Sequence, residues 1–266
     1  MTSSISTEGP TVRISGAPTN PELLSMAADA TVRTVEVGPT GLPALEPLVT
    51  VTDGGETAFH TGCSAADLDT IVAGVAEGDE LRSTDPDAFV DHEPGTTRLP
   101  PADLPGLSAG TRRVLGGAGW RRPADPADHA AAGGFETTDE TVVLDATASL
   151  QGRGWGDRCQ DEPLASTWET AREADGEPVV VVNAHGNPTD GLLLAAVPFE
   201  VLEGATATAR AVGADSVIVY ASTADQRAVE TVQEAVANYP DPAAAIDVVT
   251  GPAEHRAGEP TMALEA

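Results

Sequence analysis

Two short stretches of this sequence carry residues whose types and spacing could bind an anionic ligand, and the first is residues 150–157. It reads Leu-Gln-Gly-Arg-Gly-Trp-Gly-Asp, so that Gly152 and Gly154 flank Arg153. Glycines lack a Cβ, which lets backbone N–H groups close on an anion, and an arginine between them can pair with a phosphate. The stretch predicts a nucleotide or flavin phosphate site. An ordinary glycine turn before a buried strand is the alternative interpretation.

The second stretch is a strand that ends in a polar residue. Residues 179–182 are four consecutive valines that stop at Asn183, which is typical of a central strand in a parallel sheet. Ligands of such sheets gather at the carboxyl ends of the strands. Asn183 and Glu259 each follow a predicted strand, so we expect both at the rim of one pocket.

The charge of the chain limits its partners. Among 266 residues there are 42 Asp and Glu, 14 arginines and no lysine, which gives a formal net charge of −28. Carboxylates in such excess keep a surface hydrated and repel one another at low ionic strength, so we expect a cytoplasmic protein adapted to high internal salt. The same charge argues against nucleic acids and anionic membranes as partners. An acidic disordered protein fits poorly, because the apolar residues are periodic.

Other local signals argue against membrane, metal and cluster sites. No apolar run approaches the ~20 residues of a membrane span, and the N-terminus lacks a signal-peptide pattern. The two cysteines, Cys63 and Cys159, are too few for an iron–sulfur cluster, which requires about four protein ligands. The five histidines show no ligand spacing, and His185 and His255 are interpreted as exposed loop residues.

Residues 11–82 are predicted to form a small module after a disordered tail over residues 1–10. The expected elements are strands over 11–15 and 31–37, a helix over 21–27, a hairpin over 48–60 and a helix between Ser64 and Gly78. Residues 83–110 are rich in Pro and Gly without periodicity, and they are predicted to be a linker.

Residues 111–266 are predicted to form the second, larger domain. Strands are expected over 179–182, 216–220 and 244–249, and helices over 197–212 and 225–238. This alternation implies right-handed crossovers and an α/β domain with a doubly wound, mostly parallel sheet.

The order of several motifs in this domain resembles a known family. Leu-Gln-Gly-Arg-Gly is followed by Val-Asn-Ala, by Pro-Phe-Glu-Val-Leu-Glu-Gly over 198–204, and by Gly-Glu-Pro-Thr over 258–261. This series is similar to the flavin-bearing, NADH-oxidising 51-kDa subunit of respiratory complex I and its relatives in hydrogenases and formate dehydrogenases. The resemblance implies an FMN-binding domain that uses NAD and works with partner redox subunits. The residues it assigns to FMN are Gly152, Arg153, Gly154, Asn183, Gly258, Glu259 and Thr261.

The N-terminal module resembles the thioredoxin-like ferredoxin module associated with that family. The resemblance rests on Val-Gly-Pro-Thr-Gly-Leu-Pro over 37–43 and on Glu-Pro-Leu-Val over 46–49. Pro39 and Pro43 stand where the family has cysteines. We therefore expect a degenerate module without an iron–sulfur cluster.

The second domain also departs from the family pattern. The expected lysine falls near Thr167, an acidic pair is replaced by His185 and Gly186, and Pro260 replaces a glutamate. The helical and ubiquitin-like domains that follow in the family have no counterpart before Ala266.

Two functional hypotheses follow, besides an α/β domain without a ligand. The first is a flavoprotein in which FMN accepts a hydride from NADH within a larger complex. The second is a non-catalytic, degenerate paralogue that binds a partner or a nucleotide. A flavin-sized cleft beside Trp155 would favour the first hypothesis, and a cleft filled by Trp155 would favour the second.

Overall fold

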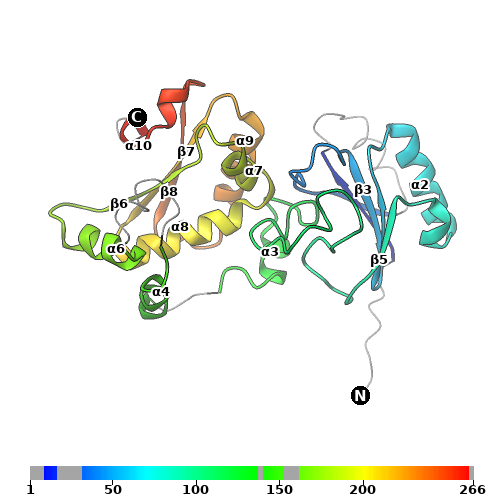
Figure 1. The fold of residues 1–266 in the computed structure, drawn as a ribbon, viewed down its shortest axis with the longest axis horizontal. Coiled ribbons are helices and arrows are strands. Elements are labelled where there is room, and N and C mark those ends of the chain that lie inside the picture. Colours follow the sequence, from blue (N-terminus) through cyan, green and yellow to red (C-terminus); the bar gives the residue numbers. More distant parts are fainter. Residues whose placement is uncertain (1–8, 17–31, 137–139, 152–161, 264–266) are drawn as a thin grey trace, which may run out of the picture. The chain divides into compact units, whose positions relative to one another are not determined.

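The structure is a computed structural model that describes residues 9–16, 32–136, 140–151 and 162–263 (Figure 1). Contacts divide the chain into two compact units, Met1–Pro123 and Ala124–Ala266. Both combine helices with a sheet, mixed in the first unit and parallel in the second, which confirms the α/β class. Most of the predicted tail, the predicted helix over 21–27 and Trp155 lie outside the described residues.

The first unit is built on a five-stranded sheet in the order β2-β1-β3-β4-β5. Its strands are β1 (Thr11–Ser15), β2 (Arg33–Glu36), β3 (Leu48–Asp53), β4 (Glu56–His60) and β5 (Ala88–Asp91). β1 and β2 are parallel, and the other neighbours are antiparallel. β3 and β4 form the predicted hairpin, and Gly54 in its turn has a φ of 57°, a conformation that favours glycine.

Helix α2 (Ala65–Glu77) packs against this sheet and has the predicted caps. The Ser64 hydroxyl accepts the N–H of Asp67, and the Asp67 carboxylate accepts the N–H of Ser64, which satisfies two amide groups at the start of the helix. Gly78 ends the helix in the left-handed region. The buried cluster between helix and sheet includes Val12, Ile14, Val49, Val51, Leu68, Ile71 and Val75.

The segment predicted as a linker, residues 83–110, belongs to the first unit. After a short 3₁₀-helix, η2 (Leu81–Thr84), it contributes β5, which pairs with β4. It also adds Leu99, Leu104 and Leu107 to a buried cluster around Trp120. The structure therefore differs from the predicted linker and from the predicted boundary at 111. Prolines and glycines remove regular periodicity, yet an irregular chain can still bury separate leucines.

The second unit contains a three-stranded parallel sheet in the order β6-β7-β8. The strands β6 (Val179–Asn183), β7 (Ser216–Ser222) and β8 (Ala245–Gly251) lie close to their predicted bounds. Val182 pairs in register with Val219, and Val219 with Val248. The apolar runs thus form the centre of the sheet.

Helices connect and cover these strands. The two predicted crossover helices are α8 (Pro198–Val212) and α9 (Gln226–Asn238). They pack on the sheet face that carries Val217, Val219 and Ala221, so Ile218 and Tyr220 point to the opposite face. The other helices are α3 (Pro126–Ala131), α4 (Glu140–Thr147), α6 (Leu164–Glu173), α7 (Pro188–Ala196) and α10 (Pro260–Ala263).

Within the described ranges, no single helix is long and apolar enough to cross a membrane. α7 and α8 reach the required length and composition only as a pair, which is bent by 101°.

The burial of the predicted linker can be tested at Leu107, which is 2% exposed. Leu107→Ala is expected to lower the free energy of unfolding by about 2–5 kcal/mol, because it leaves a cavity in the core. Val114, which lies just after this segment in the same unit, is 61% exposed. Val114→Ala is the matched control and should change stability by less than about 0.5 kcal/mol. Urea titration in molar KCl measures both, and equally small effects would contradict the observed packing.

Candidate functional site

The carboxyl edge of the parallel sheet brings two predicted site residues into contact. Asn183 ends β6, and Gly258 follows β8 at the end of η3 (His255–Gly258). The side-chain Nδ2 of Asn183 donates to the carbonyl oxygen of Gly258 at 2.9 Å. Its Oδ1 accepts the backbone N–H of His185 at 3.1 Å. Asn183 thereby holds the loop after β6 against the segment after β8.

The other predicted site residues are placed differently. Gly152, Arg153 and Gly154 lie outside the described residues. Glu259 follows Gly258 directly and its side chain is exposed. The backbone of Thr261 belongs to α10.

His185 is buried, with 7% of its surface exposed, whereas we expected an exposed loop residue. Its Nε2 lies 2.8 Å from the carbonyl oxygen of Pro252. A carbonyl only accepts, so Nε2 carries a proton, and in the neutral form of the ring Nδ1 is the acceptor. The ring stacks on Tyr220, with centroids 5.4 Å apart and planes inclined by 17°. This burial has no local signal in the sequence, because Tyr220 in β7 and Pro252 after β8 lie far along the chain from His185. His255 is exposed.

Nδ1 of His185 is the most informative atom at this edge. It is buried, and no hydrogen-bond partner lies within the described part of the chain. A buried polar atom left unpaired costs about 1–3 kcal/mol. An N–H or O–H group of a bound molecule would be stabilised here.

Gly258 permits the close approach of the two segments. A Cβ at this position would lie 2.9 Å from Nδ1 and 2.9 Å from the carbonyl oxygen of His185. Gly251 has the same role beside Tyr220, because a Cβ at position 251 would overlap the phenol group. Both glycines therefore let the rings of His185 and Tyr220 occupy their positions.

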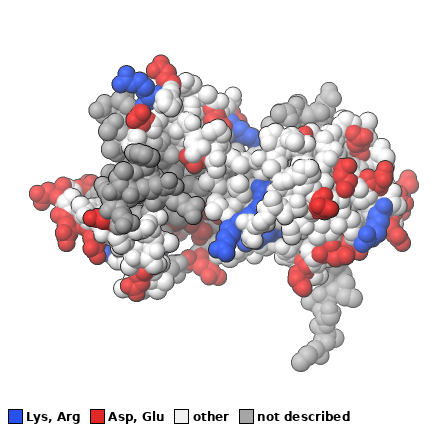
Figure 2. Space-filling view, viewed as in Figure 1, with Lys and Arg blue, Asp and Glu red and all other residues white. Residues whose placement is uncertain are grey.

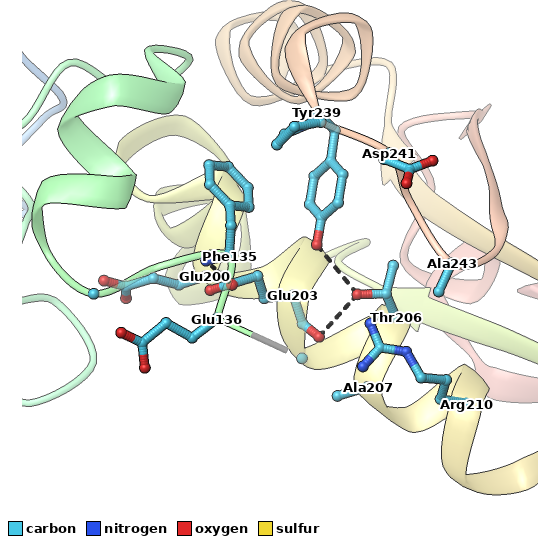
Figure 3. Close-up of a pocket in the computed structure, with 13 residues that line it drawn as sticks. Phe135, Glu136, Glu200, Glu203, Thr206, Ala207, Arg210, Tyr239, Asp241 and Ala243 are labelled. Carbon is cyan, nitrogen blue, oxygen red and sulfur yellow. Dashed lines mark hydrogen bonds between the residues drawn. The ribbon is translucent and has the colours of Figure 1, made fainter. Parts of the chain in front are cut away.

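A separate cavity of about 670 Å³ lies beside α8 (Figure 3). Its volume is within the range of about 300–1,000 Å³ that is typical of small-molecule sites. It includes none of the predicted site residues. Its lining residues are Gly133, Phe135, Glu136, Glu200, Glu203, Gly204, Thr206, Ala207, Arg210, Tyr239, Pro240, Asp241 and Ala243.

Glu203 fixes the chain segment that forms one side of this cavity. One carboxylate oxygen accepts from Nε2 of His129 at 2.7 Å, and the other accepts the backbone N–H of Phe135. Phe135 has a φ of 62°, in the left-handed region that is unfavourable for a residue with a Cβ. Its ring packs against those of His129, Phe199 and Tyr239. These contacts offset the backbone strain.

Sequence reasoning matched the motif over 198–204 but assigned no role to Glu203. Glu203 binds His129 and Phe135, which lie about 70 positions earlier in the chain. The only sign of this role in the sequence is that Glu203 and Gly204 belong to the matched motif. Thr206, one turn further along α8, donates to the carbonyl oxygen of Glu203 at 3.1 Å and lies 3.2 Å from the Tyr239 hydroxyl (Figure 3). Hydrogen bonds therefore link this part of α8 both to the segment with His129 and Phe135 and to Tyr239.

The charge of this cavity argues against an anionic ligand. Four carboxylates line it, on Glu136, Glu200, Glu203 and Asp241, against the single guanidinium of Arg210. A phosphate placed among them would be repelled. Although its volume is suitable, we therefore do not assign a flavin phosphate to it.

No group of three or more His, Cys, Asp or Glu within the described ranges could hold a metal ion. Cys63 is buried, and desolvation, with a smaller effect of Asp67, raises the pKa of its thiol to about 11. Because the thiolate is the reactive form, the raised pKa disfavours a reaction of Cys63 at neutral pH.

Residues 148–266 match the sequence model of the Nuo51 FMN-binding domain. The match lies within the second unit and covers less than half of the chain. A comparison with curated proteins finds no match.

Two crystal structures of NAD⁺-reducing NiFe-hydrogenase are also similar. The air-oxidised state aligns with 20% identity and a TM-score of 0.43, and the H2-reduced state with 19% identity and a TM-score of 0.39. Each alignment covers 94% of this chain and 44% of the other chain. This chain therefore spans less than half the length of the hydrogenase chains that it matches.

The close packing at the sheet edge can be tested with Gly258→Ala. The added Cβ meets the backbone carbonyl of His185, so this change is expected to lower the free energy of unfolding by about 1–3 kcal/mol. Gly204→Ala in α8 is the control, since its Cβ would meet no atom within 4 Å. That change should be neutral or stabilise by up to about 1 kcal/mol. Urea denaturation distinguishes the two, and a neutral Gly258→Ala would show that the edge is loosely packed.

The raised pKa of Cys63 predicts a pH dependence of stability. The folded pKa of about 11 lies above the unfolded value near 9.0, so the folded state keeps its proton longer as the pH rises. The contribution of Cys63 is complete below pH 9 and is lost between pH 9 and about 11. Cys63→Ala should therefore flatten the alkaline fall in unfolding free energy. Urea titrations across this pH range test the expectation, and parallel curves for both proteins would refute it.

Proposed function

We propose that the second unit binds FMN and that the protein is a flavoprotein subunit that takes a hydride from NADH. The observation that carries this proposal is the match of residues 148–266 to the Nuo51 FMN-binding domain. In keeping with the sequence analysis, the proposed setting is a cytoplasmic complex in which partner redox subunits receive the electrons. This chain would not insert into a membrane and would hold no iron–sulfur cluster.

The described carboxyl edge fits the neutral part of FMN. Asn183 and Gly258 are joined there, and the unpaired acceptor Nδ1 of His185 suits a hydroxyl or ring N–H group. The phosphate needs a cation, and Arg153 in the glycine-rich stretch is the residue that we propose for it. Gly152, Gly154, Glu259 and Thr261 complete the proposed set.

The protein would bind and orient, while the cofactor does the chemistry. FMN supplies a ring that accepts a hydride from a nicotinamide. Asn183 holds two loops together, so the edge is formed before the cofactor binds. The rings of His185 and Tyr220 are buried and stacked, and we propose that they lie at the base of the site.

The second candidate is a non-catalytic paralogue that binds a partner or a nucleotide. One observation favours it: His185, which replaces an acidic residue of the family pattern, is buried and already packed on Tyr220. A site altered in this way can keep its fold without keeping redox turnover.

The two candidates are distinguished by adding FMN to the full chain in molar KCl, removing free FMN and recording the visible spectrum. We expect flavin bands that NADH bleaches under anaerobic conditions. A protein that retains no FMN would refute the flavoprotein proposal and leave the paralogue.

The location of the site is tested by Asn183→Ala. Loss of its two hydrogen bonds is expected to weaken FMN binding by about 10- to 100-fold, as measured by quenching of flavin fluorescence. Asn238→Ala is the matched control, because that exposed amide donates to Ala124 in another part of the unit. Equal affinity of both variants for FMN would place the cofactor elsewhere.

A further inference from the structure

The first unit contains a group of arginines in a chain that is otherwise strongly acidic. Between residues 96 and 123 there are five arginines and one carboxylate, that of Asp103. In Figure 2 the red acidic groups are spread over the visible face, whereas the blue basic groups are few and gathered in small patches. The local charge of this segment is therefore opposite in sign to that of the whole chain.

A cavity of about 240 Å³ lies within this segment. Its lining combines two guanidinium groups, on Arg98 and Arg112, with the apolar side chains of Leu99, Pro100 and Leu107. A positive and partly apolar lining suits a small anion that carries an organic group.

Neither arginine has a carboxylate partner in the described ranges. Arg98 donates from Nη2 to the carbonyl oxygen of Arg113 at 2.7 Å, and Arg112 donates from Nη2 to the carbonyl oxygen of Thr40. Carboxylates outnumber arginines three to one in this chain, so partners are abundant elsewhere. Two arginines that meet only backbone oxygens at one cavity indicate a place for an anion from outside the chain.

Arg112 also has a donor group that needs an acceptor. Its Nη1 is buried and makes no hydrogen bond to any described residue. A charged donor left unpaired in this way costs more than the ~1–3 kcal/mol of a neutral one. Burial lowers the pKa of Arg112 from its ordinary value, and a neighbouring anion would reverse that effect.

Gly116 lets the guanidinium of Arg98 lie against the loop that carries Arg112. A Cβ at position 116 would lie 2.6 Å from Nε of Arg98 and 3.0 Å from the carbonyl oxygen of Arg112. Any larger residue would displace the guanidinium. Gly116 thus allows the guanidinium of Arg98 to lie next to the backbone that carries Arg112.

We propose that this cavity binds a phosphate group, either as inorganic phosphate or as the phosphate of a small monoester. Two guanidiniums balance the charge of about −1.5 to −2 that a phosphate monoester carries at neutral pH. Their forked N–H groups match its oxygens, and Nη1 of Arg112 gains its acceptor. Leu99 and Leu107 pack against the organic part of an ester. This site is in the first unit and does not depend on flavin binding by the second.

The test is isothermal titration calorimetry of the full chain with inorganic phosphate and with phenyl phosphate, at constant ionic strength. We expect Arg98→Gln to weaken the binding of both anions by about 10- to 100-fold. Arg112→Gln should do the same. Each substitution also removes one bond to a backbone carbonyl, and Arg98 is the decisive position because it is the more exposed of the two side chains. Thermal unfolding confirms that each variant is folded. Tighter binding of phenyl phosphate would identify an ester as the ligand, and tighter binding of inorganic phosphate would identify the free ion.

Arg82→Gln is the matched control, since it removes the same charge from the same unit outside the cavity. The exposed Arg82 side chain lies 3.8 Å from Asp91 and stacks over Phe89. The affinity of the Arg82→Gln variant for phosphate should stay within about twofold of that of the unchanged protein, because Arg82 is a surface charge outside the cavity. The proposal is overturned if neither anion binds, if Arg98→Gln binds as well as the unchanged protein, or if Arg82→Gln loses as much affinity as Arg98→Gln.

Discussion

The excess of carboxylates is the constraint on which anion binding in this protein depends. Three carboxylates are present for every arginine, and no lysine exists to add positive charge. A phosphate is stabilised only where guanidinium groups face it and carboxylates do not. The cavity beside α8 fails this condition, because Arg210 is outnumbered there. The cavity with Arg98 and Arg112 meets it. At the carboxyl edge of the parallel sheet, the positive charge for a phosphate is proposed to come from Arg153.

Regular periodicity explains how much of the fold the sequence predicts. The valine run of β6 and the capped, amphipathic α2 follow from local rules, and both lie where we expected them. The failures are segments without periodicity. Residues 83–110 bury leucines from an irregular, proline-rich path, so the core that they share with Trp120 exists only in three dimensions. α7 is apolar around much of its surface, which hides the helical period.

Only the part of the candidate site that follows from the topology of the parallel sheet was predictable from the sequence. The rule that strand ends of a parallel sheet meet at one edge pointed to Asn183 and to the segment after β8, and these are hydrogen-bonded in the structure. The burial of His185 depends on Tyr220 and Pro252, and the role of Glu203 on His129 and Phe135. Such pairings between distant residues have no signature in a single sequence.

The bond between Asn183 and Gly258 spans 75 residues, and this separation affects the order of assembly. Parallel strands cannot pair until the crossover chain between them has folded back, which makes contacts of this kind slow to form. The hairpin of β3 and β4 and the following α2 rely on neighbours in sequence and can form early. The carboxyl edge, in contrast, is completed only when β8 and η3 are in place. It therefore depends on contacts between distant parts of the chain, and local opening after β8 would dismantle it while the rest of the sheet stays folded.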